Sequence, residues 1–132
     1  MDIKKIIKLG LILLIITAVS TGLLAFVNKL TSPVIEANNI KIQEEAKKEV
    51  LSSANEFIKL TDAVYEGKNN GETVGYTVNV APKGYGGAIE MMVGINKDMT
   101  VSGVKILSMS ETPGLGAKAG NEEFINQYKG KN

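Results

Sequence analysis

The feature that most constrains this chain is an uncharged stretch of 19 residues, from position 9 to position 27. As an α-helix it would be roughly 28 Å long at ~1.5 Å per residue, close to the ~30 Å hydrocarbon core of a bilayer. A cleaved signal peptide would have an apolar region of only ~7–15 residues and a small-x-small cleavage site. Here Leu23 stands two residues before Ala25, so the pattern is not small-x-small. The stretch therefore predicts an uncleaved transmembrane anchor.

The charges around this stretch predict its orientation. Lys4, Lys5 and Lys8 precede it, and Lys29 is the lysine that follows it closely. Positive charge gathers on the cytoplasmic side of membrane anchors. We expect residues 1–30 to form a cytoplasmic stub and a single-pass anchor in the cell membrane, with the rest of the chain on the extracytoplasmic side.

The next segment, residues 31–62, has the pattern of an amphipathic helix. Ser32 and Pro33 suit the N-cap and the first helical position, and no Gly occurs between residues 31 and 66. Apolar residues fall on one helical face: Ile35, Ile42, Ala46, Val50, Ala54, Phe57 and Ile58. We expect a membrane-proximal helix that packs this stripe on a sheet. A dimerising coiled coil is the alternative, although the stripe is too short for three or four clean heptads.

The remainder, residues 63–132, predicts an antiparallel sheet with short helices, and hence an α+β fold class. Nine of the 14 glycines lie between Gly71 and Gly116. Apolar residues alternate with polar or small ones in residues 73–80 and 89–95, and residues 100–108 form a third strand-like run. Turns are expected at residues 68–71 and 96–98. We expect a short helix capped by Asn121, with Phe124 and Tyr128 reaching the core and Gly130 ending it.

Composition excludes several kinds of function. The sequence has no Cys and no His, so disulfides, iron–sulfur ligation, Cys/His zinc sites, His-ligated haem and Ser-His-Asp triads are ruled out. No metal site and no catalytic residue is predicted. The net charge is +1, without the clustered basic face that nucleic acid requires. If the domain carries electrons, an organic cofactor held by backbone groups and by shape fits this composition best.

The candidate site lies in the loop of residues 110–116, Ser-Glu-Thr-Pro-Gly-Leu-Gly, between the third strand and the short helix. Pro113 and Gly114 suit the centre of a type II turn. Gly114 and Gly116 would allow a flat ligand to approach the backbone, and Glu111 and Thr112 add a carboxylate and a hydroxyl. The alternative is an ordinary strand-to-helix turn.

A second glycine-rich segment, residues 82–87, connects two of the expected strands. It is either a simple chain reversal or a place where Tyr85 stacks near a flat ring while Gly86 and Gly87 let the backbone approach. It is not a phosphate-binding fingerprint, because it has neither the GxGxxG spacing nor a following helix.

These motifs resemble a known family. The hexapeptide Glu-Thr-Pro-Gly-Leu-Gly at 111–116 is similar to the signature of the FMN-binding domain in the G subunit of Rnf complexes and the C subunit of sodium-pumping NADH:quinone reductases. The glycine-rich segment 84–87 and residues 92–95, 101–107 and 124–131 also match that pattern. The resemblance implies that the flavin is contacted by Tyr85, Glu111, Thr112, Gly114, Leu115 and Gly116.

The resemblance also implies a function and partners. Such a chain would be a membrane-anchored electron-transfer subunit of an Rnf-type ferredoxin:NAD oxidoreductase coupled to Na⁺ or H⁺ translocation. It would work with subunits of the A, B, C, D and E types and with membrane lipid, and would have no independent catalytic activity. Many family members carry a His shortly before the Glu, where Met109 and Ser110 stand here.

In that family FMN is joined through its phosphate to the last Thr of a Ser/Thr-Gly-Ala-Thr motif. This tetrapeptide does not occur in residues 1–132. The resemblance therefore implies that the attachment Thr lies beyond Asn132, and that residues 63–132 are an FMN-binding-type domain whose C-terminal part is absent. The alternative is a non-redox extracytoplasmic assembly or binding subunit of a membrane complex.

Overall fold

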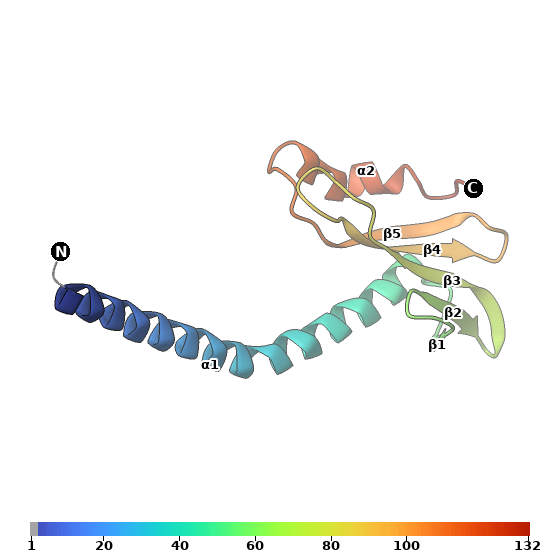
Figure 1. The fold of residues 1–132 in the computed structure, drawn as a ribbon. Helices are drawn as coiled ribbons and strands as arrows, with labels where there is room; N and C mark the ends of the chain where they lie inside the picture. The colour runs from blue at the N-terminus through green and yellow to red at the C-terminus, as the bar shows by residue number, and fades with distance from the viewer. Residues whose placement is uncertain (1–2) are drawn as a thin grey trace. The chain divides into compact units, whose positions relative to one another are not determined.

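The computed structural model describes residues 3–132 and has an α+β architecture (Figure 1). It divides into two units, residues 1–40 and residues 41–132, which are described separately. Helix α1 (Ile3–Val50) is 48 residues long. Every described residue before position 43 is exposed, and within the described chain α1 is the one helix long and apolar enough to cross a membrane.

The boundary expected at Ser32–Pro33 does not interrupt α1, which contains Pro33 in its interior. Proline lacks an N–H, so the carbonyl four residues earlier loses its helical donor. Just before it, the Thr31 hydroxyl donates to the Val27 carbonyl at 3.0 Å and the Ser32 hydroxyl to the Asn28 carbonyl at 2.7 Å. Ser32 thus bonds backward within a helix instead of capping a new one, and one continuous helix replaces the two that were predicted.

The predicted helix also ends earlier than residue 62. The Leu51 N–H still bonds to the Lys47 carbonyl at 3.1 Å, and the Ala54 N–H then closes a turn on the Leu51 carbonyl at 3.1 Å. Ser52, Ser53 and Asn55 lie in this reversal, and such residues favour turns over helix interiors. Phe57 and Ile58, which continue the helical spacing in the sequence, belong to a strand.

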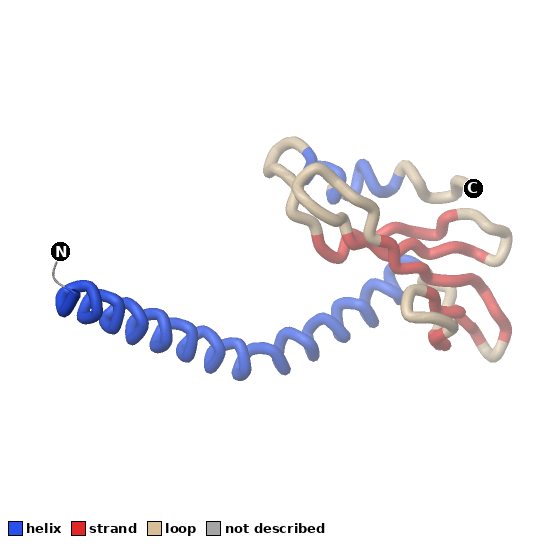
Figure 2. Tube along the Cα trace, in the orientation of Figure 1, coloured by secondary structure: helices blue, strands red, loops and turns tan. Residues whose placement is uncertain are grey.

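Five antiparallel strands form a meander in the order β1-β2-β3-β4-β5 (Figures 1 and 2). They are β1 (Glu56–Lys59), β2 (Val64–Asn69), β3 (Glu72–Val80), β4 (Glu90–Asn96) and β5 (Val101–Ser108). The three predicted strands are confirmed as β3, β4 and β5, and β1 and β2 are additional. The predicted turn before β3 is also confirmed: Asn70 and Gly71 have φ of 52° and 84°, as a type I′ hairpin requires.

The β4–β5 hairpin closes where the sequence predicted a turn. The Asp98 carboxylate accepts hydrogen bonds from the Thr100 hydroxyl at 2.6 Å and from the Thr100 N–H at 3.1 Å. These bonds, the hydroxyl first, hold the pKa of the Asp98 carboxyl below its ordinary value. The hairpin is therefore held at its tip by a local side-chain bond.

The last turn of α1 lies against a face of the sheet that is lined by glycine. A Cβ built on Gly75 would be 3.0 Å from the Leu51 side chain, and one on Gly103 would be 3.1 Å from the Val50 Cα. At Gly94 an added Cβ would overlap the Val50 carbonyl. Val50 and Leu51 are buried together with Met92 and Thr77, so the core of this unit forms where the helix end meets small residues.

Lys47 provides a second link between α1 and the sheet. Its side chain is 5% exposed, and its ammonium lies 2.5 Å from the Glu44 carboxylate and 4.1 Å from the centre of the Tyr65 ring. A buried ammonium over an aromatic face gains a cation–π interaction. This contact ties the end of α1 to β2.

The opposite face of the sheet is apolar and partly covered by α2 (Glu122–Asn126), which follows the 3₁₀ helix η1 (Gly116–Gly120). A cavity of about 410 Å³ lies here, lined by β4 and β5 residues and by Phe124, Ile125 and Tyr128. The Phe124 and Tyr128 rings touch edge to face with centroids 5.7 Å apart, yet each remains over 40% exposed. They reach the sheet less completely than predicted. Gly130 was predicted to end this helix, but α2 ends four residues earlier at Asn126, with Gln127 as its C-cap.

We predict that Gly94→Ala destabilises the sheet unit by about 1–3 kcal/mol, the usual cost of overpacking. The reason is that the new Cβ meets the Val50 backbone, which cannot move aside like a flexible side chain. The measurement is chemical unfolding of the whole chain in detergent, followed by circular dichroism. Gly22→Ala is the control, because a Cβ there meets nothing within 4 Å. An unchanged unfolding midpoint for Gly94→Ala would contradict this packing.

Candidate functional site

Both glycine-bearing loops leave the same end of the sheet. The first, residues 81–89, joins β3 to β4, and the second, residues 109–115, follows β5 (Figures 1 and 2). The register explains their proximity: Val80 pairs with Met91, and Glu90 pairs with Ser108. The start of β4 therefore lies beside the end of β5, and the segments that extend from them meet.

The Glu111 carboxylate connects the two loops. Its Oε1 accepts a hydrogen bond from the Gly86 N–H at 3.0 Å, and its Oε2 lies 2.7 Å from the position that a Cβ on Gly116 would occupy. A Cβ on Gly84 would overlap Oε1. The carboxylate of Glu111 thus lies between Gly84 and Gly86 of the first loop and Gly116, the first residue of η1.

The first loop is a small hairpin with Tyr85 at its tip. The Gly84 N–H donates to the Gly87 carbonyl at 2.7 Å, and the Ile89 N–H donates to the Pro82 carbonyl at 2.9 Å. The Tyr85 side chain is 97% exposed. The chain reversal that the sequence suggested is present, and it presents one aromatic ring to the outside.

The second loop contains the predicted turn. The Leu115 N–H bonds to the Thr112 carbonyl at 3.1 Å, and Gly114 has φ of 79°, as the third position of a type II turn requires. Leu115 is 74% exposed, and a Cβ on Gly114 would meet nothing within 4 Å. Among residues 3–132, neither the Gly114 N–H nor the Thr112 hydroxyl has a hydrogen-bond partner. The turn is therefore open on its outer side, with two free donors.

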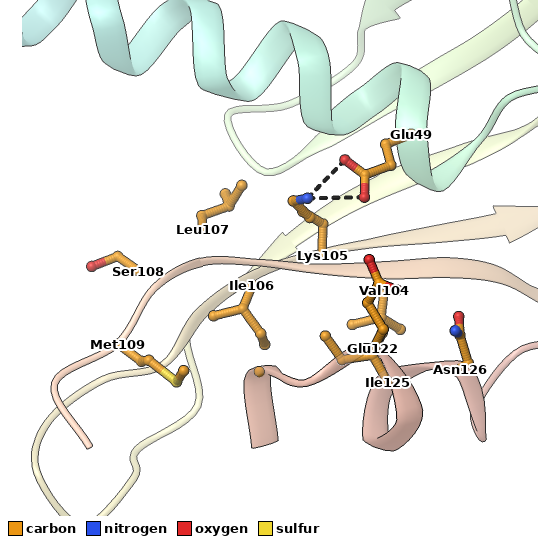
Figure 3. Close-up of a pocket in the computed structure, with 11 residues that line it drawn as sticks. Glu49, Val104, Lys105, Ile106, Leu107, Ser108, Met109, Glu122, Ile125 and Asn126 are labelled. Atoms are coloured by element: carbon orange, nitrogen blue, oxygen red, sulfur yellow. Dashed lines mark hydrogen bonds and ion pairs between the residues drawn. The ribbon is translucent and has the colours of Figure 1, made fainter. Parts of the chain in front are cut away.

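The structure also has a polar cleft that the sequence did not predict (Figure 3). It has a volume of about 450 Å³ and lies between the last turn of α1, β5 and α2. The Lys105 ammonium is 2.9 Å from Oε1 and 2.8 Å from Oε2 of Glu49. These two residues are 56 positions apart, so no local sequence signal could have joined them. None of the residues predicted to contact a ligand lines this cleft or the apolar cavity.

The candidate site can be described by the groups that it presents. Within residues 3–132 no group of three or more His, Cys, Asp or Glu side chains is placed to hold a metal ion. The candidate site is instead an exposed surface of backbone, one aromatic ring, one aliphatic side chain and two free donors. The glycines on this surface would allow a flat ligand to approach the backbone closely.

Comparison with known proteins identifies the families that this chain matches. Residues 84–132, which include both loops, match the FMN-binding domain family, and residues 1–50 match the RnfG N-terminal region. A membrane-anchored protein with an FMN-binding domain is therefore the class to which the two matches assign this chain.

The relatives are G subunits of one kind of complex. The chain is 39% identical to the G subunit of the Na⁺-translocating ferredoxin:NAD⁺ oxidoreductase complex of Acetobacterium woodii, and the alignment covers 98% of this chain and 72% of the relative. It is 36% identical to the G subunit of the proton-translocating ferredoxin:NAD⁺ oxidoreductase complex of Clostridium ljungdahlii, covering 89% of this chain and 65% of the relative. It is 32% identical to the G subunit of the ion-translocating oxidoreductase complex of Methanosarcina acetivorans, covering 96% of this chain and 74% of the relative.

The chain belongs to the family of Rnf complex G subunits. It is a membrane protein and one subunit of a larger oxidoreductase complex, as its family and its long apolar helix together indicate. The resemblance drawn from the sequence is confirmed at this level.

Proposed function

We propose that this protein relays electrons through FMN within an Rnf-type ferredoxin:NAD oxidoreductase that exports Na⁺ or H⁺. The observation that carries the proposal is the match of residues 84–132 to the FMN-binding domain, on the same chain as an RnfG-type N-terminal region. The relatives named for Na⁺ and for proton translocation support membership in a coupled complex. The protein would have no activity alone and would act with subunits of the A, B, C, D and E types.

The residues of the two loops fit a flavin. The redox chemistry belongs to the bound FMN, and the protein supplies its position and surroundings. Tyr85 and Leu115 expose apolar surface that a flat ring would cover, and the open side of Gly114 allows close approach to the backbone. The Thr112 hydroxyl and the Gly114 N–H are free to donate to ring or ribityl oxygens. We assign the flavin contacts to Tyr85, Thr112, Gly114, Leu115 and Gly116, with Glu111 beside them.

We predict that Gly114→Val, in the full-length protein within its complex, leaves membrane insertion intact but removes the normal flavin spectrum. A β-branched residue at this positive φ strains the turn by about 1–3 kcal/mol and also covers the open side. The matched control is Gly130→Val: Gly130 has the same φ of 79° and equally open surroundings, but lies outside both loops.

Thr112→Ala is the companion variant, and it should lower the flavin midpoint potential because one donor to the ring or ribityl chain is lost. Flavin absorbance and potentiometric titration of the purified complex provide the measurement. If Gly114→Val and Thr112→Ala both leave the potential and the turnover unchanged, the loop is a structural turn and the flavin lies elsewhere.

The attachment of the flavin makes a separate prediction. Because residues 1–132 contain no Ser/Thr-Gly-Ala-Thr, we propose that the phosphoester is formed on a Thr outside them. Residues 1–132 expressed alone should have the intact mass of the bare polypeptide, whereas a form that includes such a tetrapeptide should gain the mass of FMN less the one water lost when the phosphoester forms. A covalent flavin on residues 1–132 would disprove this assignment. A full-length subunit without flavin in the assembled complex would favour the assembly role instead.

The topology can be tested with single cysteines, since the natural sequence has none. We predict that Lys4→Cys is protected in intact cells and that Asp62→Cys, at a side chain that is fully exposed, reacts with a membrane-impermeant maleimide. The reason is the excess of lysines before the apolar stretch. Labelling of Lys4→Cys but not Asp62→Cys would reverse the proposed orientation.

A further inference from the structure

We propose that Glu111 is a positioning residue, whose carboxylate locks the Gly84–Gly87 hairpin onto the 110–116 loop and so fixes the surface that faces the flavin. The locking role stands on the structure of this chain alone. Its consequence for the flavin rests on the function proposed above.

Glycines surround the Glu111 carboxylate and leave space for it. A Cβ on Gly84 would overlap Oε1 of Glu111, and a Cβ on Gly116 would lie 2.7 Å from Oε2 and 3.0 Å from the Glu111 Cβ. A Cβ on Gly86 would overlap the carbonyl oxygen of Ser110, the residue just before Glu111. Two glycines of the first loop and Gly116, the first residue of η1, therefore leave room for the Glu111 side chain and the backbone just before it.

The hydrogen bond from the Gly86 N–H to the Glu111 carboxylate joins the two loops. Each loop closes on itself: Gly84 bonds to Gly87, and Leu115 bonds to Thr112. Among residues 3–132, the bond from the Gly86 N–H to Glu111 Oε1 is the only hydrogen bond between the two loops. An N–H donated to an ionised carboxylate is stronger than a neutral hydrogen bond. Without this bond, no hydrogen bond within residues 3–132 would join the two loops directly, and they would be connected through strands β4 and β5.

This geometry gives Glu111 a different task from its neighbours. Thr112, Gly114 and Leu115 are exposed, whereas Glu111 is half-buried with its carboxylate turned toward Gly86 and Gly116. One carboxylate oxygen is already committed to a backbone donor of this chain. Glu111 therefore acts on a flavin through the placement of Tyr85 and Leu115, which directly precede Gly86 and Gly116 in the sequence.

The test compares three variants of the full-length protein. Glu111→Ala removes the acceptor, Glu111→Gln keeps an oxygen for the Gly86 N–H, and Glu123→Ala is the control, because Glu123 is exposed and lies outside both loops. Two quantities are measured: the exchange rate and chemical shift of the Gly86 amide in nanodiscs by NMR, and the flavin midpoint potential in the purified complex. The first readout does not need flavin.

For Glu111→Ala we expect Gly86 exchange to accelerate about tenfold and the flavin potential to shift, while Glu111→Gln stays within about twofold in exchange and restores the potential. Unchanged Gly86 exchange in Glu111→Ala would overturn the lock. Faster exchange with an unchanged potential would overturn the effect on the flavin. If the unaltered protein carries no flavin in its complex, the proposed function fails, and the Gly86 readout still decides whether the lock exists.

Discussion

The structure of residues 41–132 depends on the close contact between the last turn of α1 and the glycine-lined face of the sheet. A Cβ added at Gly94 would overlap the Val50 carbonyl, and one added at Gly103 would lie 3.1 Å from the Val50 Cα. At Gly75 an added Cβ would lie 3.0 Å from the Leu51 side chain and would overlap the Ile95 carbonyl of the neighbouring strand. The Ser102 hydroxyl donates a hydrogen bond to the Val50 carbonyl, one of the groups that a helix end leaves without an intrahelical partner. With few large buried side chains, this contact provides much of the core.

The contact with the helix end is relevant to the candidate site because Gly94 and Gly103, which Val50 approaches, belong to β4 and β5. The start of β4 lies beside the end of β5, where Glu90 pairs with Ser108, and the two loops extend from that edge of the sheet. The hairpin that joins them is closed at the other end by Asp98 and Thr100. The packing of the helix end therefore helps to fix β4 and β5, and the register of these two strands fixes where Glu111 and the glycines around it lie.

The sequence predicted the elements whose signals are local. Asn70–Gly71 and Pro113–Gly114 carry their turn geometry in their own residue types, and both turns form as predicted. The long apolar stretch and the alternation in β3, β4 and β5 are equally local. The end of α1 was misplaced because Phe57 and Ile58 continue the helical spacing, while the true end is set by Leu51 packing on the sheet.

Contacts between residues far apart in the sequence carry no local signal. The Gly86–Glu111 bond spans 25 residues and the Lys105–Glu49 pair spans 56, so each exists only through the register of the sheet. The site residues named from the sequence are all present at one end of the sheet, but which of them touch was not predictable. Glu111 illustrates this. Its residue type alone is compatible either with contact to the flavin or with support of the loop, and the glycines and the Gly86 N–H around its carboxylate favour support of the loop.

The central claim is that the flavin of the full-length subunit lies on the surface formed by residues 84–87 and 111–116. The direct measurement is a comparison of amide chemical shifts between the oxidised and reduced full-length protein. The account predicts that the largest shifts fall on Tyr85, Gly86, Gly114, Leu115 and Gly116. Largest shifts around the Lys105–Glu49 cleft, or around Phe124 and Tyr128 at the apolar cavity, would contradict it.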